Sequence, residues 1–190
     1  MQWVVAGLGN PDEEYVGTRH NIGRDFLRDI EKKEGEKGLP AGRQGSLFGV
    51  KATLITPDVY MNNSGGPLKK MVPSKAAAQR LIVVHDELDL PLGRVKISFG
   101  SSAGGHNGVK SVIKALKTQD FVRVRVGISP TTPSGKLKRP DAEKIVDFVL
   151  GKFKPAEQEK LKKAKKVVSE ALEIILKEGV DAAMMQIHSK

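Results

Sequence analysis

The sequence of 190 residues contains no cysteine. This absence excludes disulfide bonds, thiol nucleophiles and metal sites built from thiolates. No apolar run approaches the ~20 residues that a membrane-spanning helix needs. The first residues, MQWVVAGLGNP, lack the basic segment and the long apolar core of a signal peptide. We therefore expect a cytoplasmic protein with no membrane association.

Aromatic residues are also scarce, whereas positive charge is plentiful. Phe, Trp and Tyr make up 5% of the chain, and 32 Lys and Arg residues exceed 22 Asp and Glu residues to give a formal net charge of +10. Such an excess of positive charge favours a polyanionic partner, although a charge that merely keeps the protein soluble is the alternative. Few aromatic residues argue against extensive base stacking, so phosphate contact is the better expectation.

Apolar and amphipathic segments alternate along the chain, which predicts an α/β fold with a mostly parallel sheet between helices. The length suits a single domain over residues 1–190. Two segments, 37–46 and 129–141, are rich in Gly, Pro or small residues and are expected to be loops. Strands are expected at 3–8, 51–56, 80–88, 94–100 and 121–129, and helices at 21–35, 63–74, 108–119, 141–151 and 155–179.

The segment LIVVHDELDLPLG places His85, Asp86 and Glu87 after four apolar residues. We expect these side chains where a buried strand ends, which is the edge of an α/β sheet at which ligands bind. Ordinary surface acids are the alternative. A metal site formed by these three residues and Asp89 is disfavoured, because adjacent residues on a strand point to opposite faces.

The segment GSSAGGHNG fits the G-x-S-x-G pattern of a serine hydrolase, with Ser102 as the nucleophile. Several glycines delay the start of the following helix, however, and the only histidine well downstream is His188. A glycine loop that lets the backbone approach a ligand is the preferred interpretation. His106 and Asn107 then stand just before a helix, where Asn107 can cap the helix or touch a substrate.

Two further segments carry candidate binding groups. In VYMNNSGGPL, helix capping accounts for one asparagine, whereas a second amide suits recognition of a peptide group. In FVRVRVG, Arg123 and Arg125 share one face of the expected strand. That face suits a phosphate, and pairing with nearby carboxylates is about equally plausible. The GLGNP segment lacks the third glycine of a dinucleotide-binding motif.

His20 has strongly polar neighbours in GNPDEEYVGTRHNIG, which is unusual for a core histidine and indicates a functional site. Together with four other segments, this one resembles the bacterial-type peptidyl-tRNA hydrolase family. The five segments occur in the order found in that family and cover the chain from Val4 to about Ile128. They are GLGNPDEEYVGTRHNIG, YMNNSGGPL, VVHDELDLPLG, GGHNGVKS and VRVRVGI.

The resemblance implies a single-domain three-layer α/β sandwich with a twisted mixed sheet. It also implies hydrolysis of the ester between a peptide and the 3′-terminal ribose of tRNA, which recycles tRNA from stalled translation. His20 matches the catalytic histidine of the family, which would take a proton from the attacking water, and Asp86 would orient His20. The other positions that match cleft residues of the family are Asn10, expected to be catalytic, and Tyr15, Met61, Asn62, His106 and Asn107, expected to bind substrate.

Arg125 matches a basic position of the family that is associated with the 5′ phosphate of tRNA. The second basic residue of that kind would fall near Ser98, which is not basic, and Lys96 on the same strand face is a candidate substitute. The resemblance implies no metal, no other cofactor and no obligate protein partner, and we expect a monomer. The alternatives are a non-catalytic RNA-binding protein on the same scaffold, a serine esterase that uses Ser102 and, last, a metal-dependent hydrolase.

Overall fold

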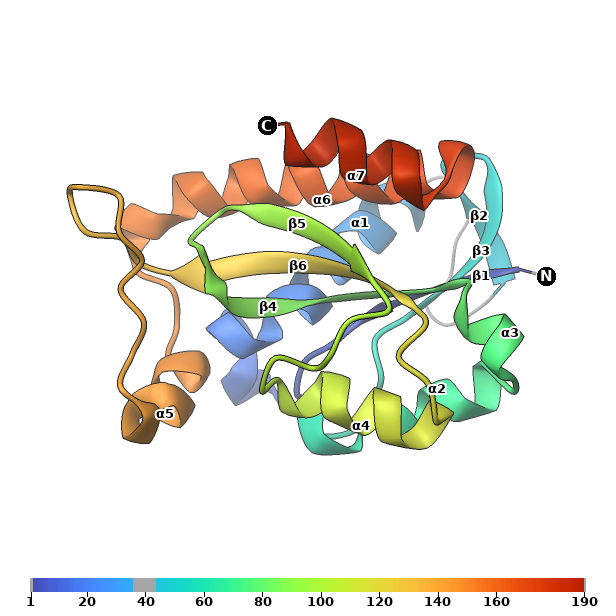
Figure 1. Ribbon diagram of the computed structural model, residues 1–190, viewed down its shortest axis with the longest axis horizontal. Helices are drawn as coiled ribbons and strands as arrows, with labels where there is room; N and C mark the ends of the chain where they lie inside the picture. Colours follow the sequence, from blue (N-terminus) through green and yellow to red (C-terminus); the bar gives the residue numbers. More distant parts are fainter. Residues whose placement is uncertain (1, 36–43, 190) are drawn as a thin grey trace.

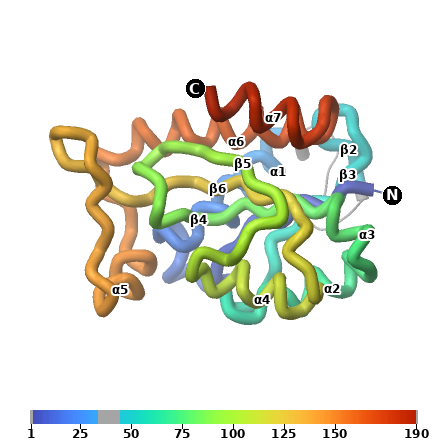
Figure 2. The backbone as a smooth tube through the Cα atoms, viewed as in Figure 1, coloured from blue at the N-terminus to red at the C-terminus, as the bar shows by residue number. Residues whose placement is uncertain are grey.

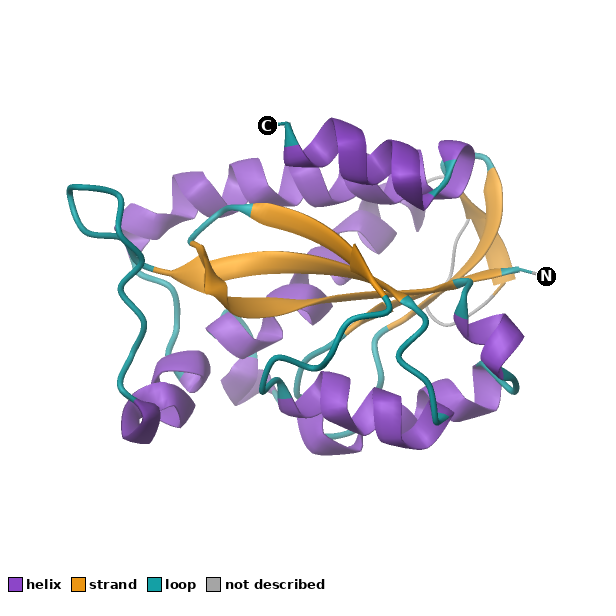
Figure 3. Ribbon diagram, in the orientation of Figure 1, coloured by secondary structure: helices purple, strands orange, loops and turns teal. Residues whose placement is uncertain are grey.

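The computed structural model describes residues 2–35 and 44–189, which form an α/β structure around one mixed sheet (Figures 1 and 3). The strands in these residues are β1 (Trp3–Gly7), β2 (Gln44–Leu47), β3 (Val50–Ile55), β4 (Leu81–Pro91), β5 (Val95–Phe99) and β6 (Val122–Ser129). The helices are α1 (Ile22–Gly35), α2 (Gly65–Met71), α3 (Lys75–Ala78), α4 (Asn107–Leu116), α5 (Ile145–Leu150), α6 (Gln158–Glu178) and α7 (Val180–His188). Short 3-10 helices are η1 (Glu13–Tyr15), η2 (Arg19–Asn21), η3 (Met61–Asn63), η4 (Ala142–Lys144) and η5 (Pro155–Glu157).

The strand order is β2-β3-β1-β4-β6-β5. The central pairs β3–β1, β1–β4 and β4–β6 are parallel, and the outer pairs β2–β3 and β5–β6 are antiparallel. The expected α/β fold with a mostly parallel, mixed sheet is therefore confirmed.

Helices cover both faces of the sheet and form three layers (Figures 1 and 2). Helices α1, α6 and α7 lie on one face, where Val84, Val124 and Leu172 belong to one buried apolar cluster. Helices α2, α3 and α4 lie on the other face, where Leu68 and Val112 belong to a second buried cluster. Helix α5 lies at the end of the sheet to which β4 and β6 run, and its Val149 belongs to the first cluster.

Strand β4 is longer than the sequence pattern indicates. Its parallel pairing with β1 ends at Gly7 opposite Val84, but its pairing with β6 continues through Asp86 and Glu87, and β4 ends at Pro91. The expected strand, 80–88, is therefore too short at its end, and the carboxylates do not lie where the strand ends. These residues lie inside β4, beyond the point where β1 leaves it, and this leaves one edge of β4 open to other elements.

Close backbone contact fixes helix α1 against this part of the sheet. A Cβ atom added at Gly23 would lie 2.2 Å from the carbonyl oxygen of Val84, and one added at Gly7 would lie 2.4 Å from the carbonyl oxygen of Gly23. Only glycine permits such an approach. The start of α1, and His20 just before it, can therefore lie beside β4.

The structure contains three elements that the sequence did not predict: strand β2 and helices α3 and α7. Gln44–Leu47 forms β2, so the expected loop 37–46 is wrong for its last residues, and the rest of that loop lies outside the described residues. Helix α7 buries Ala183 and Ile187 in the first apolar cluster.

Residues 130–141 contain no helix, and their only strand-type contact in the described chain is a bridge between Thr131 and Leu137. No helix in the described ranges has the length and apolar character needed to cross a membrane.

Candidate active site

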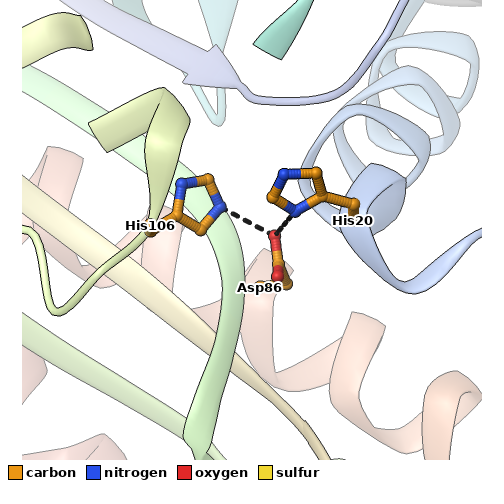
Figure 4. Close-up of side chains that lie close together, drawn as sticks. All are labelled: His20, Asp86 and His106. Carbon is orange, nitrogen blue, oxygen red and sulfur yellow. Dashed lines mark hydrogen bonds and ion pairs between the residues drawn. The ribbon is translucent and has the colours of Figure 1, made fainter. Parts of the chain in front are cut away.

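His20 lies in η2, one turn before α1, and its ring faces β4 (Figure 4). Its Nδ1 atom is 2.9 Å from Oδ1 of Asp86, and the His20 side chain is 12% exposed. An ionised carboxylate only accepts hydrogen bonds, so Nδ1 of His20 must carry the proton that it donates. In neutral His20, Nε2 is therefore left with a free lone pair.

His106 approaches the same carboxylate oxygen from the opposite side, at the start of α4 (Figure 4). Its Nδ1 atom accepts hydrogen bonds from the backbone N–H groups of Gly108 and Val109, at 3.1 and 3.2 Å. Nδ1 therefore carries no proton, and the ring proton lies on Nε2, which is 2.8 Å from Oδ1 of Asp86. His106, rather than Asn107, caps the helix. We refer to His20, Asp86 and His106 as the histidine–aspartate cluster.

The cluster sets the protonation states of its members. Burial disfavours the charged form of Asp86, but the electrostatic attraction of His20 and His106 and the hydrogen bonds from both rings outweigh burial and hold the pKa of Asp86 well below its usual value. Burial likewise disfavours protonated His20, but the charge and hydrogen bond of Asp86 outweigh it and raise the pKa of His20. A charged Asp86 thus stabilises a proton on His20, as a general base requires.

His85 lies behind this cluster and is fully buried. Its Nδ1 donates to the backbone oxygen of Asp86 at 2.6 Å, and its ring packs edge-on against His106 with centroids 4.7 Å apart. Burial holds the pKa of His85 well below its usual value, so His85 stays neutral. It packs against His106 of the cluster, and it is not among the residues that line the two cavities described below.

The expected carboxylates do not converge on one metal position. Glu87 accepts from Arg125, and Asp89 pairs with Arg139 on the surface. A different set, the histidine–aspartate cluster itself, has ligand atoms within 4.8 Å of one another and could hold a metal ion. Nδ1 of His20 and Nε2 of His106 direct N–H groups at Asp86, however, so a metal would have to displace both protons.

Two cavities meet at His20. One, of about 150 Å³, is lined by the cluster and by Glu87, Gly104, Gly105 and Arg139. The other, of about 460 Å³, is lined by asparagine side chains and by Tyr60, Met61 and Leu150. His20, Asn107, Val146 and Val149 line both cavities. A substrate bound across the two cavities would therefore pass over the His20 ring.

Asn10 directs its amide group toward the larger cavity. Its Oδ1 accepts the backbone N–H of Met61 at 2.8 Å, which leaves its Nδ2 as a donor in the cavity that His20 also lines. Asn21 fixes the backbone of Asn10 by accepting from its N–H at 2.8 Å and donating to its C=O at 2.9 Å. The structure therefore brings Asn10 together with His20 and makes Asn10 a fixed donor.

The expected substrate-binding residues divide into two groups. Asn62 and Asn107 are exposed and line the larger cavity, and neither provides a side-chain cap to a helix. Met61 is buried and forms part of the wall of that cavity. Tyr15 lines neither cavity. Its ring stands edge-on to Tyr60, which does line the larger cavity, with centroids 6.4 Å apart.

Ser102 does not have the surroundings of a serine nucleophile. It is exposed in a loop, and α4 begins only at Asn107. Within the described part of the chain, no hydrogen bond joins Ser102 to a histidine. The neighbouring Ser101 accepts from buried Arg123 at 2.6 Å.

Arg125 and Lys96 are directly opposite each other on β6 and β5, and we call them the basic pair. Nε of Arg125 donates to Glu87 at 2.9 Å, so the ion pairing considered as an alternative is present. The Arg125 side chain is still 24% exposed and Lys96 is partly exposed. Ser98 of β5 lies opposite Arg123 of β6, two residues along each strand from the basic pair.

Residues that the sequence interpretation missed hold the cleft together. Buried Arg24 donates to the backbone oxygen of Pro57 at 2.6 Å and to Asp58 at 3.2 Å, and so anchors the loop before Met61. Arg24 lies off the apolar stripe of α1, so helical periodicity gives no sign of its burial. Arg19 and Asn21 are the other missed residues that hold the cleft together, and the sequence marked them by their place in the polar run TRHN.

Comparison with known proteins adds independent information. The family model described as peptidyl-tRNA hydrolase matches residues 4–190. The peptidyl-tRNA hydrolase of Carboxydothermus hydrogenoformans is 38% identical over 96% of each chain, and that of Thermotoga petrophila is 42% identical over 95% of this chain and 94% of the relative. The crystal structure of peptidyl-tRNA hydrolase from Acinetobacter baumannii superposes with a TM-score of 0.82 at 29% identity, covering 98% of this chain and 94% of that chain.

Proposed function

The chain belongs to the peptidyl-tRNA hydrolase family, and from that premise we propose that it cleaves the ester between a peptide and the 3′-terminal ribose of tRNA with His20 as the general base. One observation carries the assignment of the base. Asp86 binds Nδ1 of His20, and His20 lies where the two cavities meet. The buried carboxylate fixes which nitrogen of His20 carries the proton, as the aspartate of a catalytic triad does for its histidine.

The reaction needs no protein nucleophile. Nε2 of His20 takes a proton from a water molecule as the oxygen of that water attacks the ester carbonyl carbon. Asp86 stabilises the resulting imidazolium. When the tetrahedral intermediate collapses, the bond between the acyl carbon and the ribose oxygen breaks, and His20 returns its proton to that oxygen. The products are a peptide with a free carboxylate and a tRNA with a free ribose hydroxyl.

Asn10 is suited to stabilise the negative charge that develops on the carbonyl oxygen. Its Oδ1 is occupied by Met61, so only its Nδ2 donor is available to a substrate. A donor that is fixed before the reaction needs no reorganisation as the charge forms. We assign Asn62 and Asn107 to the peptide groups of the substrate, because free amides can both donate and accept.

His106 has a different role from the substrate contact expected for it. Its two ring nitrogens are occupied by the start of α4 and by Asp86. We assign it to hold the Asp86 carboxylate in place. Met61 provides an apolar wall, and Tyr15 acts indirectly by supporting Tyr60.

The basic pair, Lys96 and Arg125, is assigned to a phosphate of the tRNA. Both side chains reach solvent, and the Glu87 partner of Arg125 is the residue after Asp86. A phosphate held there would therefore lie near the cleavage site. Lys96 would supply the second positive charge that Ser98 does not.

We further propose that residues 1–190 act as a single domain and as a monomer without an obligate protein partner. The residues assigned to the reaction lie on a strand of one sheet or on the helices and loops that adjoin it, and residues of this chain line both cavities. Because its substrate arises during translation, we place the protein in the cytoplasm. We also propose that the reaction is independent of metal ions and other cofactors.

The experiment is release of peptide from N-acetyl-aminoacyl-tRNA with a chelator present, for the wild type, His20→Ala and a control, His188→Ala. His188 lies on α7 and accepts a hydrogen bond from the backbone of Ile97, away from both cavities. Turnover in the wild type and the control, with loss of several orders of magnitude in His20→Ala, would support the proposal. Binding of tRNA without turnover in the wild type would instead indicate a non-catalytic RNA-binding protein.

A further inference from the structure

Arg19, the residue before His20, directs its guanidinium away from the cleft. It is buried, and both Oε atoms of Glu157 accept from its Nη2 at 2.9 Å. Its Nη1 donates to the backbone oxygen of Lys152 at 2.7 Å. The rings of Phe148 and Phe153 lie 4.7 and 4.8 Å from the guanidinium carbon. One side chain thus contacts α5, the segment after it and η5.

Backbone hydrogen bonds join the same two regions of the chain. The N–H of Arg19 donates to the C=O of Gly151 at 3.1 Å, and the N–H of Phe153 donates to the C=O of Gly17 at 3.3 Å. Thr18 and Lys152 form an antiparallel bridge between them. The turn that carries His20 and the segment that follows α5 are therefore attached to each other at backbone and side-chain level.

Helix α5 forms one wall of the cleft. Val146 and Val149 line both cavities, and Leu150 lines the larger one. Val146 is 62% exposed and Leu150 is 37% exposed, so both present apolar surface that a bound substrate can cover. The distance between this wall and His20 determines whether a substrate can contact both at once.

We propose that Arg19 is a positioning residue that holds α5 at a fixed distance from His20 and so sets the width of the cleft for the substrate. The inference rests on the proposed function. The planar guanidinium binds Glu157 through Nη2 and the backbone oxygen of Lys152 through Nη1 while it lies over two aromatic rings, and the single nitrogen of a lysine ammonium cannot occupy both positions. The position after Thr18 therefore requires arginine rather than positive charge alone.

Arg19→Lys tests this requirement, because it keeps the charge and loses the planar group. We expect KM for N-acetyl-aminoacyl-tRNA to rise about tenfold, the order of effect of losing a small apolar contact. We expect kcat to change little, because the hydrogen bonds of the histidine–aspartate cluster do not include the guanidinium, and a contact made equally in the ground and transition states affects KM alone. For the same reason the pH profile of kcat should stay as in the wild type.

Glu157→Gln is the milder second variant, since it keeps the shape of the partner and one acceptor. We expect a smaller rise in KM. Asp29→Asn is the matched control: it removes an ion pair between α1 and Lys165 of α6 without touching α5, and KM should not change. All variants are compared at a temperature where circular dichroism shows them folded, and Glu157→Gln carries the test if Arg19→Lys does not fold.

Hydrogen exchange provides a readout that is independent of turnover. Amides of residues 145–153 should exchange faster in Arg19→Lys and Glu157→Gln, while those of α4 should not. Faster exchange with an unchanged KM would overturn the inference, as would a raised KM with unchanged exchange. If the wild type released no peptide, the proposed function would fail, whereas exchange would still show whether Arg19 holds α5.

Discussion

The histidine–aspartate cluster, which surrounds Asp86 of β4, and the basic pair on β5 and β6 are built in opposite ways. The cluster side chains are 12% (His20), 3% (Asp86) and 8% (His106) exposed, and their hydrogen bonds fix which nitrogen carries each proton. Arg125 is 24% exposed, and its ion pair with Glu87 restrains it. Proton transfer requires fixed protonation states at fixed distances. Phosphate binding requires charge that a flexible polyanion can reach through solvent.

The largest effect should come from the buried member of the cluster. Asp86→Asn removes the charge that stabilises protonated His20 and allows the wrong tautomer of His20. By analogy with the equivalent change in a catalytic triad, kcat should fall by about 10⁴-fold. Affinity for tRNA should remain within the range of the wild type, as measured by filter binding.

The nearby exposed Asp89 provides the matched control for this variant. Asp89→Asn removes a surface ion pair with Arg139 and should leave kcat almost unchanged. Equal losses in the two variants would show that the acidic segment as a whole, and not the buried carboxylate, supports catalysis.

Asn10 should have the next largest effect. Asn10→Ala removes the donor directed into the larger cavity, and loss of a donor to a developing oxyanion typically lowers kcat by about 10²–10³-fold. Single-turnover cleavage measures this step directly. Asn63→Ala, which removes another amide from the same cavity, is the control. A rise in KM with an unchanged kcat would assign Asn10 to substrate binding instead.

The basic pair should affect binding and leave chemistry intact. Arg125→Ala and Lys96→Ala should each weaken binding of full tRNA and reduce the slope of log affinity against log salt by about 1. Cleavage of a minimal aminoacyl-nucleotide ester, which lacks the 5′ phosphate and the rest of the tRNA, should be less affected.

Lys51 lies on β3, far along the sheet order from β5 and β6, and Lys51→Ala serves as the charge control. Equal effects of Arg125→Ala on the full and minimal substrates would rule out the phosphate role. An effect of Lys51→Ala as large as that of Arg125→Ala would mean that only the overall charge matters.

Ser102 should show the smallest effect. Ser102→Ala changes an exposed loop residue. Such surface changes usually alter free energies by an amount that corresponds to about a twofold change in a rate or an equilibrium constant. Peptide release under saturating substrate provides the measurement. Loss of activity comparable to that of His20→Ala would revive the serine-esterase mechanism.

The sequence predicted the parts of the molecule that depend on local pattern. Alternating apolar runs located the central strands, and the polar surroundings of His20 marked it as functional. Strand β4 was predicted too short because it continues as a partner of β6 alone, where its apolar pattern stops. Ala183 and Ile187 of α7 are buried only because α7 packs on the rest of the fold.

Contacts between distant segments were not predictable in the same way. Arg19 meets Glu157, which is 138 residues away, and no local pattern indicates that pairing. The tautomer of His106 depends on two backbone N–H groups at the start of α4, so its role became visible only in three dimensions. Family resemblance placed His106 among the substrate-binding residues and did not indicate its hydrogen bond to Asp86.

The central claim is that Asp86 tunes His20 as the base. The most direct measurement is the pH dependence of single-turnover ester cleavage by the wild type and by Asp86→Asn. Rate falls as His20 becomes protonated, and the pKa of His20 is raised above 6.5 by Asp86, so the wild-type rate should decline below an apparent pKa higher than 6.5. In Asp86→Asn, burial is no longer opposed by the carboxylate, and the decline should move to lower pH in the residual activity. A decline at the same pH in both proteins, or no decline in the wild type, would contradict the account.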